Sequence, residues 1–262
     1  MSVLEEIHSL KPEQTQLLHA EVIDGQSLEV RQYEQYRWMN IGGQCIQSLV
    51  DVDLPDQFML PNIQAMLGAL LFCPHPEHVL NLGFGGGSIE RFFMSKLPEL
   101  DLTSVDSNES VIHLTKKYFS VPEDYVVVMD SAEHYLSLVN DKFDIIFCDI
   151  FFAERHPDCL YEDEFYANTF NALKDQGVLA LNLLPLSEQE IIEILIQIRN
   201  HFKSVLLLET PNHANIILFA LTGEAPSLKV METQAVKLLY EPGIDIRDVP
   251  ARLNVLPAKA KE

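Results

Sequence analysis

The sequence predicts an α/β fold: a seven-stranded, doubly wound and mostly parallel sheet, preceded by a small antiparallel β domain. From Val79 onward, short apolar runs alternate with amphipathic stretches, which is the pattern of a parallel sheet covered by helices on both faces. The last two apolar runs are separated only by residues 210–214. This connection is too short for a crossover, so these two strands must be antiparallel.

The strands and helices of this sheet follow one another in a regular order. The apolar runs predict strands over residues 79–82, 102–106, 125–129, 143–149, 177–183, 204–209 and 215–222. The stretches between them predict helices over residues 88–97, 108–119, 131–139, 162–173 and 187–202. In the last helix, Ile191, Ile194 and Ile198 recur at helical spacing. Ser187 with Glu190 has the pattern of a capping box at its start.

The regions on either side of the large sheet differ from it. Two β-rich runs flank Gly42-Gly43, a signal for a hairpin or a bulge. We therefore predict an N-terminal β-hairpin domain over residues 1–60, with a flexible lead, and a connecting helix over residues 61–72. The sheet domain would cover residues 61–223, followed by a proline-containing C-terminal extension over residues 224–262 with a frayed tip.

Composition and charge exclude several classes of protein. The chain has 262 residues, of which 47% are hydrophobic and 22% charged, an ordinary mixture for a folded protein. It carries 18 Lys and Arg against 39 Asp and Glu, for a formal net charge of −21. So acidic a surface repels phosphate backbones, which argues against nucleic acid as a partner. It would attract a cationic substrate such as a polyamine, although an acidic surface also serves solubility alone.

Neither a membrane span nor a secretory signal is predicted. The longest charge-free apolar stretch is interrupted by Pro61, Asn62 and Gln64, and residues 1–18 lack a basic start and an apolar middle. The four cysteines form no C-x-x-C pair, and three of them lie among apolar neighbours. This usage is typical of reduced thiols, so we expect a cytoplasmic protein.

A glycine-rich turn between the first strand of the sheet and the helix after it is the most informative segment. It contains Gly83, Gly85, Gly86 and Gly87. Glycines let the backbone turn and approach a ligand closely, although they also serve tight packing of a strand against a helix. Asp106 follows Gly83 by 23 residues and ends the second strand, where a carboxylate accepts hydrogen bonds from a ribose diol. Together they predict that residues 61–223 form a Rossmann-like, nucleoside-binding domain.

Two more acidic residues end predicted strands. Asp130 and Ser131 follow the third strand, where they could hold an adenine amino group, cap the next helix, or do both. Asp149 ends the fourth strand, at the edge where ligands gather in such sheets, and is our catalytic candidate. A loop or helix cap is the alternative for Asp149, and Asp144 at the start of the same strand is expected to be structural.

Other catalytic patterns are absent from the sequence. Cys73, His75 and His78 lie close together, but no second cluster supplies further ligands, so we predict no metal site. His113, His134 and His201 fall on predicted helices as surface positions. No P-loop, H-E-x-x-H or G-x-S-x-G motif occurs.

Several short segments resemble motifs of one enzyme family. They are Cys45-Ile46-Gln47, the glycine turn with Asp106, Asp130-Ser131, Phe143-Asp144-Ile145-Ile146, Asp149, and Leu160-Tyr161-Glu162-Asp163-Glu164-Phe165-Tyr166, which is similar to L-[FY]-x-x-E-F-Y. From about residue 28 to residue 183 the chain therefore resembles the spermidine synthase (polyamine aminopropyltransferase) family. The resemblance implies a sheet of the S-adenosylmethionine-dependent methyltransferase type, a homodimer and a role in polyamine biosynthesis.

The resemblance also implies which residues bind the donor, decarboxylated S-adenosylmethionine. Gln47 and the glycine turn would face its sulfonium, Asp106 its ribose, and Asp130 with Ser131 its adenine. In the reaction that it implies, an amine nitrogen attacks the methylene carbon beside the sulfonium, and methylthioadenosine leaves. A carboxylate near the nitrogen can hold the cationic amine and accept its proton, and Asp149 would take that role.

The chain departs from the family in the amine-binding half. Where the family reads G-G-G-D-G, Gly86 replaces the aspartate, and the family's D-S-S-D reads Asp149-Ile150-Phe151-Phe152. The family's Y-x-E-M reads Leu60-Pro61-Asn62-Ile63. We therefore expect donor recognition to be kept better than acceptor recognition, because a buried diamine needs charged partners.

Three functions stay open on this reading. The first is transfer of an aminopropyl group to a small amine acceptor other than putrescine. The second is methyl transfer from S-adenosylmethionine itself, which would use the same sheet and the same donor residues. The third is a catalytically inactive binding module of the same fold.

Overall fold

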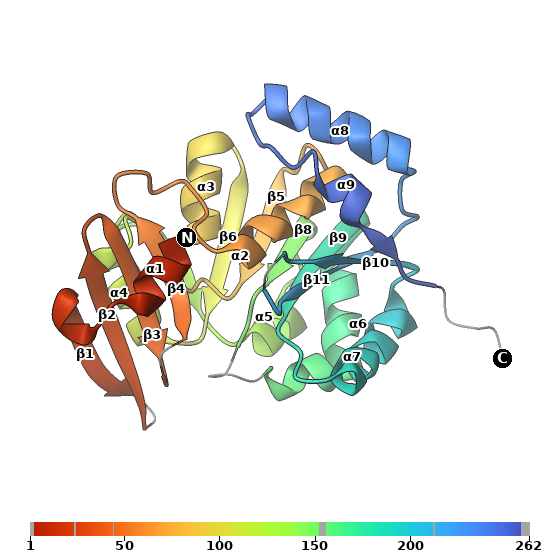
Figure 1. Ribbon diagram of the computed structural model, residues 1–262. Coiled ribbons are helices and arrows are strands. Elements are labelled where there is room, and N and C mark those ends of the chain that lie inside the picture. The colour runs from red at the N-terminus through yellow and green to blue at the C-terminus, as the bar shows by residue number, and fades with distance from the viewer. Residues whose placement is uncertain (1–2, 24, 44, 152–155, 212, 258–262) are drawn as a thin grey trace.

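The computed structural model describes residues 3–23, 25–43, 45–151, 156–211 and 213–257, which form two sheets lying side by side (Figure 1). The smaller sheet is antiparallel in the order β1-β2-β3-β4, and the larger has the order β12-β10-β11-β9-β8-β5-β6-β7. Both parts of the predicted fold class are therefore confirmed.

The N-terminal sheet contains more than the predicted hairpin. Its strands are β1 (Gln16–Ile23), β2 (Gln26–Tyr33), β3 (Tyr36–Ile41) and β4 (Ile46–Asp51). The hairpin around Gly42 joins β3 to β4, as predicted. Before residue 27 the sequence predicts no element, but helix α1 (Val3–Ser9), a 3-10 turn (Pro12–Gln14) and β1 lie there. Ile7 of α1 is buried against Trp38 and Leu49, which anchors this lead to the sheet.

The large sheet has all seven predicted strands and one more. They are β5 (His78–Leu82), β6 (Asp101–Asp106), β7 (Val127–Met129), β8 (Phe143–Cys148), β9 (Leu173–Leu183), β10 (Ser204–Glu209) and β11 (Ile216–Leu221). The pairing of β10 with β11 is antiparallel, as the short connection requires. The additional strand, β12 (Asn254–Val255), is too short to give a sequence pattern and pairs with the edge of β10.

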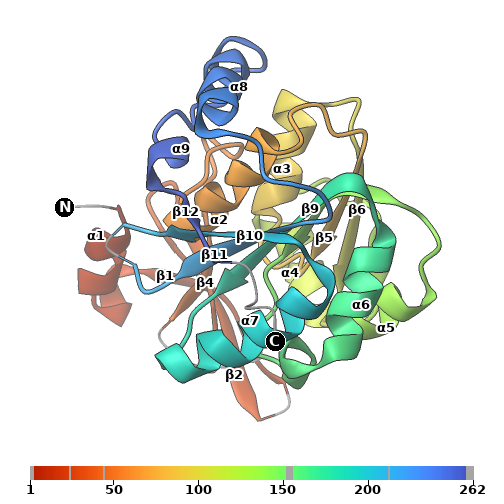
Figure 2. The same cartoon turned by 90° about the vertical axis from the view of Figure 1, so that its right-hand side faces the viewer.

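Helices cover both faces of this sheet (Figure 2). The described helices after residue 60 are α2 (Pro61–Met66), α3 (Ser88–Lys96), α4 (Glu109–Tyr118), α5 (Ala132–Leu138), α6 (Asp163–Ala172), α7 (Glu188–His201), α8 (Leu228–Tyr240) and α9 (Val249–Arg252), with 3-10 segments Leu67–Leu71 and Asp158–Tyr161. The predicted helix over residues 61–72 is thus α-helical only in its first half. Among the described residues, no helix is long and apolar enough to cross a bilayer.

The cap of α7 differs in part from the predicted capping box. The Ser187 side chain accepts the backbone N–H of Glu190, as predicted. The Glu190 carboxylate, however, accepts the N–H of Leu186 instead of that of Ser187.

The core explains why the central strand β8 reads as an almost continuous apolar run. Along β8, Ile145 and Phe147 belong to the cluster under α2, α3 and α8, whereas Ile146 and Cys148 belong to the cluster under α5, α6 and α7. The side chains from Ile145 to Cys148 are therefore buried, whichever face of the sheet they point to. Helix α4 instead packs on the N-terminal sheet through Val111, Leu114 and Phe119, which brings that sheet next to the ends of β5 and β6.

Candidate functional site

A cavity of about 520 Å³ lies where the carboxyl ends of four adjacent strands meet the N-terminal sheet. The glycine turn after β5, Asp106 at the end of β6, Asp130 after β7 and Asp149 after β8 all line it. Gln47 and Ser48 of β4 line it from the opposite side. Because parallel strands end at the same edge, side chains far apart in the sequence meet here.

The glycine turn is shaped by close approaches that exclude a side chain. Gly83 has a φ of +94°, and a Cβ there would lie 2.3 Å from the carbonyl oxygen of Asp149. At Gly87, with a φ of +68°, a Cβ would lie 2.5 Å from Val121 Cγ2. Gly83, Gly85 and Gly86 line the cavity, whereas Gly87 is the N-cap residue of helix α3 and does not line it.

Gly86 has a different environment from the other glycines of the turn. A Cβ at this position would lie 2.4 Å from Ser48 Cβ and 2.7 Å from Ser48 Oγ. Ser48 of β4 therefore occupies the space that a side chain at position 86 would need. A side chain fits at position 86 only if the turn or β4 shifts.

Arg91 stabilises the glycine turn by a hydrogen bond to the backbone of Gly86, and the sequence alone did not single this residue out. Its guanidinium donates to the carbonyl oxygens of Pro55, Phe119 and Gly86, the first two at 2.6 and 2.9 Å. The residue is only 4% exposed, and burial lowers its pKa to about 10, so it stays charged at neutral pH. The signal available in the sequence was an arginine placed among the apolar residues near the start of the predicted helix over residues 88–97.

Asp106 is fixed next to the turn by backbone donors. Its Oδ2 accepts the N–H of Gly85 at 3.1 Å, and its Oδ1 accepts the N–H of Asn108 at 2.9 Å. Burial raises the pKa of Asp106, and these hydrogen bonds oppose that rise. The structure therefore brings together the glycine turn and the acid that the sequence pairs.

Asp130 and Ser131 have different roles in the structure. Ser131 is the N-cap of α5, because its side chain accepts the N–H of His134, and it does not line the cavity. Asp130 does line it. The carboxylate of Asp130 also accepts the N–H of Ser131 at 2.8 Å and contacts Nδ1 of His134 at 2.8 Å.

Asp149 lines the cavity beside the glycine turn. Its Oδ1 accepts the Nδ2–H of Asn182 at 2.6 Å, and Asn182 Oδ1 in turn accepts from Asn215 at 3.1 Å. Burial raises the pKa of Asp149 to about 6, opposed by the hydrogen bond from Asn182. A carboxylate with such a pKa is ionised at pH 7 and takes up a proton more readily than an ordinary aspartate.

The charged side chains among the described lining residues of the cavity are all acidic. Its acidic residues are Asp106, Glu109, Asp130 and Asp149, and the described residues that line it include no lysine, arginine or histidine. Such a cavity attracts cations and disfavours a free carboxylate. Of the positions that depart from the family pattern, Leu60, Ile63, Gly86, Ile150 and Phe151 line this cavity, while Phe152 lies outside the described residues.

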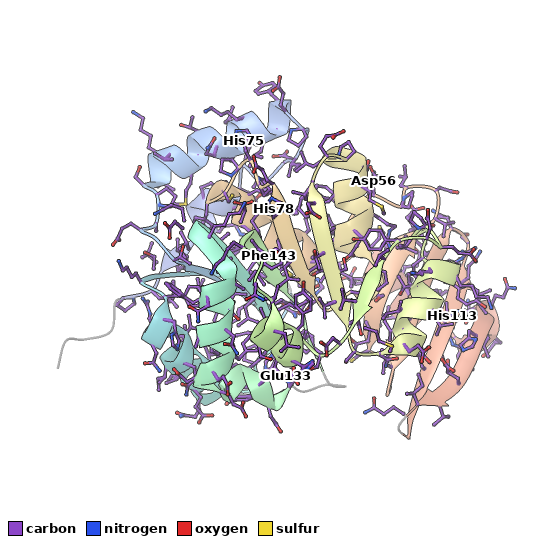
Figure 3. The ribbon with its side chains drawn as sticks, turned by 180° about the vertical axis from the view of Figure 1, so that it is seen from behind. Asp56, His75, His78, His113, Glu133 and Phe143 are labelled. Carbon is purple, nitrogen blue, oxygen red and sulfur yellow. The ribbon has the colours of Figure 1, made fainter. Side chains whose placement is uncertain are left out.

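The cysteine and histidine group lies at the other end of the sheet. His75 and His78 are near Phe143, where β5 and β8 begin, and Glu133 marks the carboxyl end (Figure 3). In the part of the chain that the structure describes, no three His, Cys, Asp or Glu side chains converge on a metal position. Cys73, Cys148 and Cys159 form no disulfide with one another. Asp144 is structural, as predicted: it accepts from the N–H groups of Glu77 and His78 and pairs with Lys174.

Comparisons of the sequence point to one family. The model of the spermine/spermidine synthase domain matches residues 63–226. A polyamine aminopropyltransferase of Neisseria meningitidis is 29% identical over 227 residues, covering 83% of this chain and 85% of the relative. One from Chromobacterium violaceum is 30% identical over 211 residues, covering 78% of this chain and 79% of the relative.

Solved structures share the fold. A probable spermidine synthase from Corynebacterium glutamicum has a TM-score of 0.70 at 16% identity, covering 84% of this chain and 86% of its own. Spermidine synthase from Thermotoga maritima has a TM-score of 0.67 at 20% identity over 92% of this chain and 84% of its own. Human methyltransferase-like protein 13 in complex with SAH has a TM-score of 0.58 at 18% identity over 69% of this chain and 88% of its own. The fold, the glycine turn and the sequence comparisons agree, and the chain belongs to the spermine/spermidine synthase family.

Proposed function

We propose that this protein binds decarboxylated S-adenosylmethionine and transfers its aminopropyl group to an amine. The observation that carries the proposal is the convergence of Asp106, Asp130, Asp149 and the glycine turn on one cavity. These groups come from four adjacent strands, β8, β5, β6 and β7. The family of the chain supports the same assignment.

The donor would lie along this edge of the sheet. The carboxylate of Asp106 would accept hydrogen bonds from the ribose hydroxyls, and Asp130 would accept from the adenine amino group. Gln47 and the backbone at Gly83, Gly85 and Gly86 would surround the sulfonium. Ser131 and Gly87 would act indirectly, since they are the N-cap residues of α5 and α3 and do not line the cavity.

The charge of the cavity favours the decarboxylated donor over S-adenosylmethionine itself. The decarboxylated form carries a sulfonium and an ammonium, and both fit among four acidic residues. S-Adenosylmethionine adds a carboxylate, for which the described lining residues provide no basic partner. A buried carboxylate without a partner is costly.

Asp149 would serve the acceptor. Its carboxylate would hold the incoming ammonium and accept one proton, which leaves a neutral amine as the nucleophile. The nitrogen then forms a bond to the methylene carbon beside the sulfur, while the carbon–sulfur bond breaks. The bonding pair stays on sulfur, which leaves as neutral methylthioadenosine, and the proton passes from Asp149 to solvent.

Release of methylthioadenosine tests this function directly. We expect product when the protein is incubated with decarboxylated donor and a panel of amines, and we expect Asp149→Asn to lose most of it. Calorimetry should show tighter binding of the decarboxylated than of the carboxylated donor. Preference for the carboxylated donor would favour a methyltransferase, and donor binding without any product would favour an inactive binding module.

A further inference from the structure

We propose that the acceptor is a monoamine with an apolar body, not a diamine. This inference rests on the proposed function, since it concerns the acceptor half of the same cavity. It is carried by four apolar side chains, Leu60, Ile63, Ile150 and Phe151, which line the cavity together with Asp149. We call these four residues the acceptor wall.

The acceptor wall lies next to the carboxylate that would hold the reacting amine. Ile150 directly follows Asp149, and its Cγ2 lies 3.4 Å from the position that a Cβ of Gly83 would have. Leu60 and Ile63 approach from the start of helix α2 and are packed into the core under α2 and α3. Ile63 is only 8% exposed, whereas Leu60, Ile150 and Phe151 are half-buried and present apolar surface to the cavity.

The acidic residues of the cavity are distributed unevenly. Asp106 and Glu109 lie at the end of β6 and the start of α4, and Asp130 follows β7, all on the side assigned to the donor. Asp149 directly precedes Ile150 and Phe151 of the acceptor wall, and among the described lining residues the other three acids come from β6, α4 and the end of β7. One of its oxygens already accepts from Asn182. A single carboxylate there can balance one ammonium group.

A diamine would bring a second ammonium group. Alkyl ammonium groups have pKa values near 10, so at neutral pH both ends of a diamine are charged. With one end at Asp149, the other end would face the apolar side chains of the acceptor wall, where the described lining residues offer no second carboxylate. Burying an unpaired ammonium is strongly unfavourable, so the second charge would weaken binding.

An apolar chain has the opposite effect on binding. Each methylene that leaves water against the acceptor wall improves affinity by roughly fourfold. The wall therefore selects for hydrocarbon at the position where a diamine would place its second charge. Ile150 is the specificity-determining residue that the geometry indicates, because it joins the wall to Asp149.

Matched amines test the inference on the unaltered protein. Butylamine and putrescine have the same four-carbon chain and differ in the second amino group. We expect kcat/KM for methylthioadenosine release to be at least about tenfold higher with butylamine, and higher again with hexylamine. Equal or greater kcat/KM with putrescine would overturn the monoamine proposal while leaving aminopropyl transfer intact. If the donor binds in calorimetry but no amine gives product, the transfer function fails, and this inference fails with it.

A substitution at Ile150 tests where the selectivity comes from. Ile150→Asp places a carboxylate in the acceptor wall. Ile150→Asn introduces a side chain of the same size as aspartate but without the charge. We expect the ratio of putrescine to butylamine kcat/KM to rise at least about tenfold in the aspartate variant relative to the asparagine variant. Tyr240→Asp, on the exposed end of α8, controls for the change in overall charge. An unchanged ratio in a folded Ile150→Asp protein would contradict the role of the acceptor wall. If that variant does not fold, the comparison of butylamine with putrescine on the unaltered protein still tests the proposal.

Discussion

His156 and Glu190 form a hydrogen-bonded pair that fastens the segment before α6 to the start of α7. Nδ1 of His156 lies 2.7 Å from Oε1 of Glu190, and Nε2 accepts the N–H of Leu184 at 2.9 Å. Because Nε2 accepts, the proton of the neutral ring must be on Nδ1, facing the carboxylate. The hydroxyl of Tyr161, in the motif at residues 160–166, also donates to Glu190.

We expect Glu190→Gln to destabilise the protein by about 1–3 kcal/mol at neutral pH, since it removes an ionised acceptor shared by several donors. Burial raises the pKa of Glu190, but the hydrogen bonds from Tyr161, Leu186 and His156 outweigh it, and the net pKa is lowered. A carboxyl group whose pKa is lower in the folded than in the unfolded protein stabilises the folded state at pH values above its unfolded pKa of about 4.3. This stabilisation is lost as the pH falls below that value and through the folded-state pKa.

Urea unfolding of wild type and Glu190→Gln at several pH values measures this effect. The difference in unfolding free energy should be largest near neutral pH and should shrink below about pH 4. Glu193→Gln is the matched control, because Glu193 is exposed on the same helix. A difference that stayed constant down to low pH would contradict the ionised role of Glu190.

The pH dependence of transfer should report Asp149. Burial places its pKa at about 6, so kcat/KM should fall as the pH drops below about 6 and the carboxylate takes up a proton. Asn182 donates to the ionised form and thereby lowers the pKa of Asp149. Asn182→Leu should therefore move this limb of the profile to higher pH. Asn215→Ala leaves the hydrogen bond between Asn182 and Asp149 in place and should shift the acidic limb of the profile less. An identical pH profile in wild type and both variants would argue against Asp149 as the base.

Restoring the aspartate of the family motif should fail in this chain. Gly86→Asp places a Cβ 2.4 Å from Ser48 Cβ, a contact that one of the two segments must relieve. We expect a loss of about 1–3 kcal/mol in stability, as for other insertions into packed space. Ser48→Gly in the same protein should recover a large part of the loss. Thermal melts of the two single variants and the double variant would reveal this coupling, and additive effects would show that Ser48 is not the obstacle.

Glu90 should be a source of instability at neutral pH. It is fully buried in α3, where its Oε1 accepts from Asn81 and Ser104, and burial raises its pKa. For an acid with a raised folded-state pKa, stability is greatest below the unfolded pKa of about 4.3 and decreases as the pH rises. Glu90→Gln keeps an acceptor oxygen without the charge.

The expected result is that Glu90→Gln unfolds at a higher temperature than wild type near pH 7, by an amount equivalent to more than about 1 kcal/mol. The two proteins should converge toward pH 4. The exposed Glu99→Gln variant should match wild type throughout. If Glu90→Gln were less stable than wild type at pH 7, the ionised carboxylate would stabilise the folded protein, and the prediction would be wrong.

The parallel sheet could be predicted because its strands are buried on both faces and read as continuous apolar runs. The site could be predicted in outline for a related reason: Asp106, Asp130 and Asp149 each end a strand, and parallel strands end at one edge. Asn182 and Asn215 could not be assigned to Asp149, because that contact depends on β9 lying between β8 and β11. A single asparagine in the apolar run of β9 was the only hint.

Two terminal elements escaped prediction for different reasons. Helix α1 gains its order from contact of Ile7 with Trp38 and Leu49, which lie far along the chain and leave no local pattern. Helix α8 does have a local pattern, since Met231, Ala235 and Leu238 are buried at helical spacing. The prolines on either side of it obscured that signal.

The packing of α4 on the N-terminal sheet determines how this protein can be divided. Val111, Leu114 and Phe119 are covered by Leu28, Met39 and other residues of that sheet. A shortened version starting at residue 61 would present these three side chains to water and remove the side of the cavity that β4 forms, so it should aggregate. Domain exchange with a relative would therefore succeed only if α4 travels with the N-terminal sheet.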